Sequence, residues 1–173
     1  MFYPALLNLP DDELVMITDM DMLPTNDIYY KSNLDNFKLD DFIYYRHIDG
    51  NQIYMCYNAA HPKTWGKVFG INNSDDIKKI LYDNYVNNYN GISGSIGWYK
   101  DQELMYSKLF NYENLKVLNR PLKRLEVYMY KYHLQNNNTN FINHYDDCHF
   151  HRNFLLNETL ILDAQKQLNI TRK

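Results

Sequence analysis

The alternation of short apolar runs with polar turns predicts a chain of strands and helices. Leu14–Thr18 is apolar, β-prone and bounded by charge on both sides, which predicts a buried strand of a mixed or parallel sheet. An Asp49-Gly50 pair lies between two apolar runs and predicts a hairpin turn. The remaining predicted strands are Phe42–His47, Gln52–Asn58, Leu115–Leu118, Glu126–Tyr130 and Phe141–His144.

Helices are predicted where capping residues precede apolar positions at helical spacing. Asn26 or Thr25 is a suitable N-cap, Gly70 a suitable stop, and Ser74 a cap at the start of a longer helix. Asn87–Gly97 is rich in Asn, Ser and Gly and predicts a loop. The predicted helices are Asn26–Leu34, Pro62–Phe69, Ser74 to about Asn88, Tyr99–Phe110 and Asn153 to about Leu168. Together these elements predict an α/β fold with a mixed sheet flanked by helices.

Length and composition narrow the class of protein. A chain of 173 residues with 45% hydrophobic residues suits a single domain over residues 1–173 with a real core. A net charge of -3 gives no reason to expect a nucleic-acid partner. No stretch approaches the roughly 20 apolar residues that span a bilayer, and the start lacks the features of a signal peptide. We therefore expect no membrane span. Two cysteines, Cys56 and Cys148, are too few for a disulfide framework, which suits a reducing compartment, so we expect a cytoplasmic protein.

The apolar run Leu14–Thr18 leads directly into two aspartates, Asp19 and Asp21. A carboxylate pair at the end of a buried strand is costly unless something offsets its charge, and a divalent cation does so most simply. Oxygen ligands suit Mg²⁺ or Mn²⁺, and a nearby imidazole shifts the preference toward Mn²⁺. Because open α/β sheets bind ligands at the carboxyl ends of strands, the sequence predicts a divalent metal site here. The alternative is that an aspartate caps the short helix that follows.

Phosphohydrolases of the haloacid dehalogenase type also place an Asp-x-Asp motif after a strand. In such an enzyme Asp19 would be the nucleophile. Their motif continues with a Thr, whereas this chain has Leu23 and Pro24. A phosphohydrolase is therefore the weaker alternative.

Three stretches, taken in order, point to another family. Val15–Pro24 (VMITDMDMLP) is similar to a DxD segment followed by Pro, and Gly97–Tyr106 (GWYKDQELMY) to a GW-x-x-DQ-x-L segment. Tyr145–Arg152 (YDDCHFHR) is similar to a late D-x-H-x-x-R segment. In this order and spacing the chain resembles viral and bacterial glycosyltransferases of the metal-dependent GT-A type, from Tyr3 to about Leu162.

The resemblance implies a metal-bound donor. Asp19, Asp21 and a late histidine would bind Mn²⁺ or Mg²⁺, which bridges the diphosphate of a nucleotide-sugar. His149 fits the late position best, and His151 is the reserve, since alternate residues of an extended segment share a face. The alternative for His149 is an imidazole that is simply exposed or satisfied in the core.

An acidic neighbour can orient a metal-binding imidazole. Asp146 and Asp147 precede His149 and are the expected partners. This proximity favours a ligand role for the histidine.

The resemblance also implies an acceptor side, where a glycan or another hydroxyl-bearing acceptor would bind. Asp101 would act as the catalytic base for the acceptor hydroxyl, and Gln102 would lie near the anomeric carbon. The alternative for Asp101 is a first-turn helix role. Trp98 would contribute to donor binding as a sugar platform, whereas Trp65 suits a core position better. Weaker candidates are Asn58 and His61 for the acceptor, and Arg120, Lys123 and Arg124 for the diphosphate.

Compared with the family, this sequence has little before the DxD strand. We therefore expect a GT-A-like fold that is N-terminally truncated, whose missing surface a homo-oligomer would cover. A non-catalytic sugar- or partner-binding relative is the main alternative function. The Tyr- and Asn-rich composition suits a large DNA virus, which would place the protein in the host cytoplasm.

Overall fold

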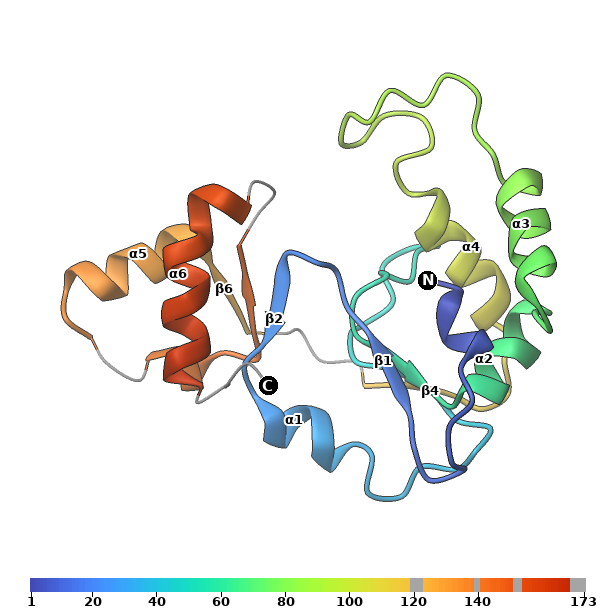
Figure 1. The fold of residues 1–173 in the computed structure, drawn as a ribbon, viewed down its shortest axis with the longest axis horizontal. Coiled ribbons are helices and arrows are strands. Elements are labelled where there is room, and N and C mark those ends of the chain that lie inside the picture. Colours follow the sequence, from blue (N-terminus) through green and yellow to red (C-terminus); the bar gives the residue numbers. More distant parts are fainter. Residues whose placement is uncertain (119–122, 139–140, 151–153, 169–173) are drawn as a thin grey trace. The chain divides into compact units, whose positions relative to one another are not determined.

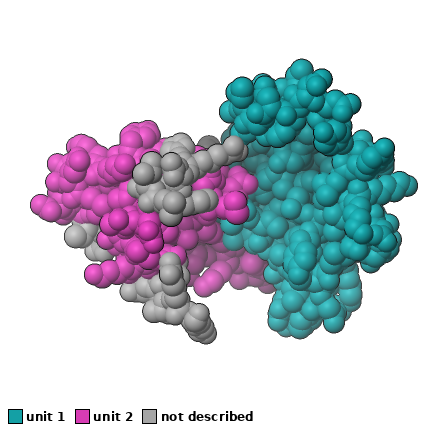
Figure 2. Space-filling view, turned by 45° about the horizontal axis from the view of Figure 1, so that its top comes forward, with its two compact units in different colours: residues 1–18, 37–120 teal, residues 19–36, 121–173 magenta. Residues whose placement is uncertain are grey.

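The chain folds into two compact units, each with a small mixed sheet and helices. The computed structural model describes residues 1–118, 123–138, 141–150 and 154–168, and the side chains of the last range from 157 onward. Unit 1 comprises Met1–Thr18 and Phe37–Arg120, and unit 2 comprises Asp19–Asn36 and Pro121–Lys173 (Figure 2). The predicted α/β class with mixed sheets and flanking helices is thus confirmed. The prediction that residues 1–173 form a single domain is not tested by this division into two compact units.

Unit 1 contains a four-stranded sheet in the order β1-β4-β3-β5. Its strands are β1 (Val15–Ile17), β3 (Phe42–Tyr44), β4 (Asn58–Ala60) and β5 (Leu115–Val117). β4 runs antiparallel to both β1 and β3, and β5 runs parallel to β3. The central strands β3 and β4 are buried along their whole length. β1 is only partly buried, with Met16 36% exposed, because it forms the edge of the sheet; its predicted burial was wrong.

Helices of unit 1 pack around a cluster of aromatic side chains. They are η1 (Tyr3–Leu6), α2 (Pro62–Phe69), α3 (Ser74–Asp83) and α4 (Lys100–Leu109) (Figure 1). α2 begins at a proline and ends at Gly70, whose φ of 69° is the left-handed value that glycine adopts freely. Trp65 stacks on Phe69 at 5.6 Å between ring centroids and meets Phe42 of β3 edge-on at 4.7 Å. These contacts fix α2 against the sheet.

Unit 2 contains a three-stranded sheet in the order β2-β7-β6. Its strands are β2 (Met22–Pro24), β6 (Arg124–Glu126) and β7 (Asp147–His149). β7 pairs antiparallel with β2 and parallel with β6. The remaining elements are α1 (Asp27–Ser32), α5 (Val127–Gln135), η2 (Phe141–His144) and α6 (Phe154–Gln167).

The two faces of this sheet differ sharply in chemistry, because strand residues alternate in direction. The middle residue of each strand, Leu23, Cys148 or Leu125, packs into an apolar core with aromatic residues of the unit. α5 and α6 both contribute to that core (Figure 1). A 2.8 Å hydrogen bond from the Tyr130 hydroxyl to Asp163 joins the two helices. The flanking residues of β6 and β7 therefore form a polar face on the other side.

Most predicted helices and one cap are confirmed. Asn26 caps α1 by accepting a hydrogen bond from the Tyr29 amide, and α2 and α4 occupy the predicted ranges. α3 ends at Asp83 rather than near Asn88, and Asn73 rather than Ser74 caps it. The predicted turn at Asp49-Gly50 forms, but the strand after it is Asn58–Ala60 instead of Gln52–Asn58.

Two predicted strands were wrong. Their apolar side chains all pack into one core, whereas a strand would point successive side chains to opposite faces. Glu126–Tyr130 lies mostly in helix α5, whose Val127, Tyr130 and Leu134 share a face at helical spacing. Phe141–His144 forms the 3₁₀ helix η2. Phe141 and Ile142 are both buried in the same cluster, whereas a strand would point them in opposite directions.

The expectation of no membrane span can be compared with the lengths of the helices. Within the described ranges, every helix falls short of the length and apolar character that a bilayer crossing requires.

We predict that Gly66→Ala lowers the stability of the protein by about 1–3 kcal/mol, the range of overpacked sites. A Cβ at this position of α2 would lie 2.8 Å from the Ile71 carbonyl oxygen. Urea denaturation of both proteins measures the change. Helix propensity alone favours Ala over Gly by about 0.5–1 kcal/mol, so a more stable variant would contradict the steric argument.

Candidate functional site

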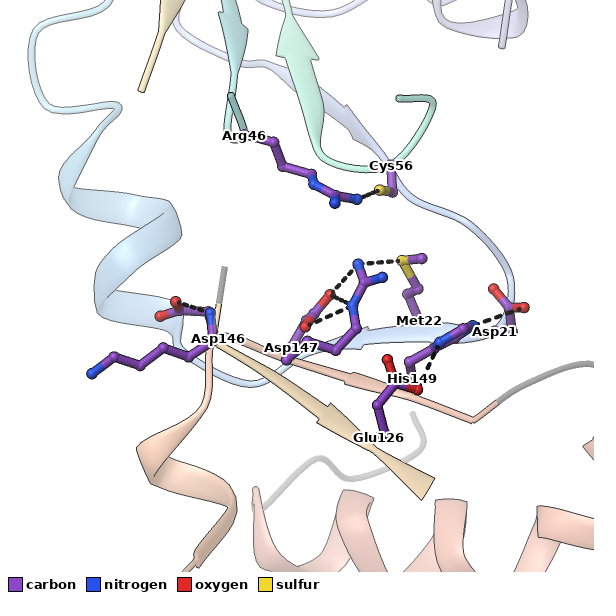
Figure 3. Close-up of polar contacts among 10 residues, drawn as sticks. Asp21, Met22, Arg46, Cys56, Glu126, Asp146, Asp147 and His149 are labelled. Atoms are coloured by element: carbon purple, nitrogen blue, oxygen red, sulfur yellow. Dashed lines mark hydrogen bonds and ion pairs between the residues drawn. The ribbon is translucent and has the colours of Figure 1, made fainter. Parts of the chain in front are cut away.

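The polar face of the sheet in unit 2 carries two side-chain pairs that follow directly from the β6–β7 register. Arg124 is opposite Asp147, and Glu126 is opposite His149. On the other edge of β7, Met22 of β2 is opposite His149. Figure 3 shows these side chains gathered on one side of the strands. The register therefore places a nitrogen-bearing side chain beside a carboxylate at each of two successive outward-facing positions.

The first pair is a buried ion pair. Asp147 is fully buried and receives hydrogen bonds from Arg124 Nε at 3.0 Å and Nη2 at 2.9 Å (Figure 3). Arg124 Nη2 also lies 3.4 Å from the sulfur of Met22. A carboxylate so deeply buried needs such a forked partner, because unpaired it would lose the solvation of a full charge.

The second pair extends to a third residue. His149 Nδ1 lies 3.1 Å from Glu126 Oε2, and His149 Nε2 lies 3.4 Å from Asp21 Oδ2 (Figure 3). The three side chains are between 18% and 26% exposed, so they are shielded yet open to small ions. The imidazole thus stands between two carboxylates, with one on each ring nitrogen.

Backbone contacts hold Asp21 in this position. The Phe150 amide donates to the Asp21 carbonyl at 2.8 Å, which extends the β2–β7 ladder by one step. The Met22 amide donates to the Asp19 carbonyl at 3.1 Å and closes a tight turn across the DxD motif. Neither aspartate caps the following helix, since Asn26 does so. The alternative capping role is therefore wrong.

The predicted metal ligands are brought together only in part. Asp21 and His149, distant in the sequence, are neighbours. In the part of the chain that the structure describes, no three His, Cys, Asp or Glu side chains are arranged to hold a metal ion. Asp19 as a third ligand stays a prediction. His151, the reserve ligand, lies outside the described residues.

The Asp21–His149 pair fits a divalent ion by donor type and by spacing. Two adjacent ligands with bonds of about 2.1 Å are about 3.0 Å apart in an octahedral site and about 3.4 Å apart in a tetrahedral one. The observed separation of 3.4 Å between Oδ2 and Nε2 equals the tetrahedral value and is about 0.4 Å longer than the octahedral one. One carboxylate oxygen and one imidazole nitrogen favour Mn²⁺ over Mg²⁺.

The acidic sequence neighbours of His149 do not orient its ring, contrary to expectation. Asp146 instead accepts hydrogen bonds from the Asn26 side chain at 2.9 Å and from the Lys123 amide at 3.0 Å. Asp147 is taken up by Arg124. Glu126 contacts the imidazole in their place.

Unit 1 contains a separate feature, a cavity of about 280 Å³ lined by Trp98 and Asp101 among mostly apolar side chains. Burial raises the pKa of the Asp101 carboxyl above its usual value, and a hydrogen bond from the Gln102 amide acts in the opposite direction. That 2.8 Å bond is the first-turn role expected as the alternative for Asp101. Asp101 therefore both lies in the first turn of α4 and lines a cavity.

Gln102 does not line this cavity, but its side-chain oxygen is buried. Among the described residues this oxygen has no hydrogen-bond partner. A buried amide oxygen without a partner is a costly arrangement that is common at functional positions.

The weaker candidates take structural roles where the structure describes them. Trp65 is fully buried in the core of unit 1, as its alternative role required. His61 caps α2 through Nδ1, and its Nε2 lies 3.2 Å from the Pro10 carbonyl oxygen. Asn58 is buried and donates to the Tyr54 and Met55 carbonyls. Arg124 belongs to the ion pair with Asp147, and Arg120 lies outside the described residues.

Sequence reasoning missed Glu126 and the pairing of Arg124. A signal was present: Arg-Leu-Glu at 124–126 and Asp-Cys-His at 147–149 are triplets with apolar centres. When the two triplets lie side by side in parallel, Arg124 pairs with Asp147 and Glu126 pairs with His149. The complementarity could have predicted both the β6 strand and its register.

Comparisons of the chain with models of protein families, with curated proteins and with solved structures find no match.

We predict that Arg124→Met lowers the free energy of unfolding by about 3–5 kcal/mol, because it leaves the buried Asp147 carboxylate unpaired. Chemical denaturation measures the loss. Lys31→Met is the matched control: it breaks an exposed pair with Asp27 and should have no measurable effect. Combining Arg124→Met with Asp147→Leu should recover most of the stability. An additive loss in the double variant would contradict the buried-charge argument.

We predict that Asp101→Asn stabilises the protein at neutral pH. Because the folded-state pKa of Asp101 is raised, its charged form is destabilising above that pKa, and the cost disappears as pH falls below the unfolded value. The amide keeps an oxygen that can accept the Gln102 hydrogen bond. Thermal unfolding between acid and neutral pH should show a gain at neutral pH that shrinks on acidification. A gain independent of pH would argue against desolvation as its cause.

Proposed function

We propose that the protein is a metal-dependent glycosyltransferase of GT-A type, which moves a sugar from a nucleotide-diphosphate donor to an acceptor hydroxyl. The observation that carries the proposal is the 3.4 Å approach of Asp21 Oδ2 to His149 Nε2. The family resemblance expected these two residues, far apart in the sequence, to share an ion. The β2–β7 pairing holds the two residues next to each other at the edge of the polar face, where both side chains reach the same space.

On the donor side, Asp21 and His149 would hold Mn²⁺ or Mg²⁺, with Asp19 as the third ligand. The bound ion would offset the negative charge of the departing nucleoside diphosphate. Side chains supply few ligands here, which suits ions that keep waters and substrate phosphate oxygens in their coordination shell. Arg124 would contribute indirectly, because its pairing with Asp147 fixes the strand that carries His149.

On the acceptor side, Asp101 would take the proton of the attacking hydroxyl. The raised pKa of its carboxyl makes it a better proton acceptor than an ordinary aspartate. Trp98 in the same cavity offers an aromatic face to a sugar ring. The segment 84–98 contains no charged side chain and is rich in Asn, Tyr, Ser and Gly, which suits a neutral, hydroxyl-bearing acceptor. Gln102 would lie near the anomeric carbon, as the family resemblance implies.

A non-catalytic relative that binds a sugar or a partner is the second candidate. It is favoured by the partial ligand set, since no three-ligand group occurs among the described residues. The two candidates differ in whether donor turnover accompanies metal binding.

We predict that Asp21→Ala and His149→Ala each abolish Mn²⁺ binding in calorimetry and donor hydrolysis or sugar transfer with a panel of nucleotide-sugars. Asp35→Ala and His144→Ala are matched controls, because both residues are exposed in unit 2. They should leave binding and turnover unchanged. Mn²⁺ binding without turnover of any donor would favour the non-catalytic relative. Full activity in Asp21→Ala would refute the metal site.

A further inference from the structure

We propose that Glu126 is a positioning residue, which holds the His149 ring so that Nε2 is presented to a metal ion beside Asp21. The inference rests on the proposed metal site and adds a residue that the family resemblance did not supply. It is carried by the 3.1 Å contact between Glu126 Oε2 and His149 Nδ1.

The strand register makes this contact a built-in feature of the sheet. Glu126 and His149 are direct partners in the parallel β6–β7 pairing, and the neighbouring pair Arg124–Asp147 fixes the same register. Leu125 and Cys148 anchor the opposite face in the core. A slip of one residue would bury the charged side chains, so the sheet cannot easily separate Glu126 from His149.

Glu126 also occupies a position where its carboxylate could have had another use. It is the N-cap residue of α5, a position at which Ser, Thr, Asp and Asn side chains commonly accept a hydrogen bond from the first turn of the helix. Its side chain makes no such bond. The carboxylate turns instead toward the imidazole, and α5 begins without a side-chain cap.

The consequence concerns which ring nitrogen carries a proton. Each ring nitrogen faces a carboxylate, and Glu126 at 3.1 Å is nearer than Asp21 at 3.4 Å. A neutral ring with its N–H on Nδ1, toward Glu126, leaves the lone pair on Nε2. Nε2 and Asp21 Oδ2 then direct electron pairs into the same space, where a divalent ion relieves their repulsion. Partners of this kind raise the basicity of a metal-binding histidine and fix its ring orientation.

The experiment compares Glu126→Ala, Glu126→Gln and the exposed control Glu158→Ala in the full chain. Calorimetry with Mn²⁺ alone measures metal affinity, and ¹⁵N NMR of the metal-free protein at mildly alkaline pH identifies the protonated nitrogen of His149. We expect a protonated Nδ1 in the unmodified protein, and a shift of that proton to Nε2 in Glu126→Ala. Mn²⁺ affinity should fall by about 10- to 100-fold in Glu126→Ala. Glu126→Gln should lose less, because its amide oxygen can still accept the bond, and Glu158→Ala should lose nothing.

Each outcome has a defined meaning. An unprotonated Nδ1 in the unmodified protein, or unchanged Mn²⁺ affinity in Glu126→Ala, overturns the role of Glu126. If Glu126→Ala does not fold, Glu126→Gln takes its place in the comparison. The proposal is overturned if Nδ1 of His149 is unprotonated in Glu126→Gln and the Mn²⁺ affinity still equals that of the unmodified protein. Failure of the metal site itself is distinguished by Mn²⁺ binding that survives Asp21→Ala and His149→Ala. In that case the NMR result still reports whether Glu126 orients the ring.

Discussion

The parallel pairing of β6 with β7 is the constraint on which unit 2 depends. One register sets Leu125 beside Cys148 in the core and Arg124 beside Asp147 on the polar face. Burial of the apolar centres and neutralisation of a fully buried carboxylate therefore require the same alignment. Because strand side chains alternate, neither requirement can be met by a shifted pairing without losing the other. A short sheet of three-residue strands gains a single defined arrangement in this way.

The alignment of β6 with β7 also sets the geometry of the candidate metal site. His149 follows the buried Asp147–Cys148 pair on β7, and Glu126 ends the strand that lies parallel to it. Asp21 arrives from the other edge, where the Phe150 amide binds its carbonyl oxygen. Glu126 and His149 lie on strands, and Asp21 lies in the turn directly before β2, where a backbone hydrogen bond from Phe150 holds it. Sites on rigid elements keep their groups close to productive positions, and binding then requires little ordering.

Two acids, one in each unit, show how its surroundings set the chemistry of a carboxyl group. Asp147 is buried and receives forked hydrogen bonds from the Arg124 guanidinium. Asp101 has an amide hydrogen bond but borders an apolar cavity, and its pKa is raised. The first arrangement favours stability of the fold, and the second favours reactivity of the carboxyl. The proposed function uses both, one to fix a ligand-bearing strand and one to accept a proton.

The family resemblance of the sequence singled out Asp21 and His149 as candidates. The sequence by itself also determined the α/β class, the ranges of α2 and α4 and the Asn26 cap. Local signals suffice there, since caps, glycine stops and apolar spacing act within a few residues. Only the tertiary structure decided that Val127–Gln135 is a helix, that Phe141–His144 is a 3₁₀ turn, and that Glu126 rather than Asp146 meets the imidazole. The physical reason is that these outcomes depend on which distant segment supplies the partner. Burial in a shared core and the register of a parallel strand pair each depend on two segments together. The sequence of one segment alone therefore does not predict them.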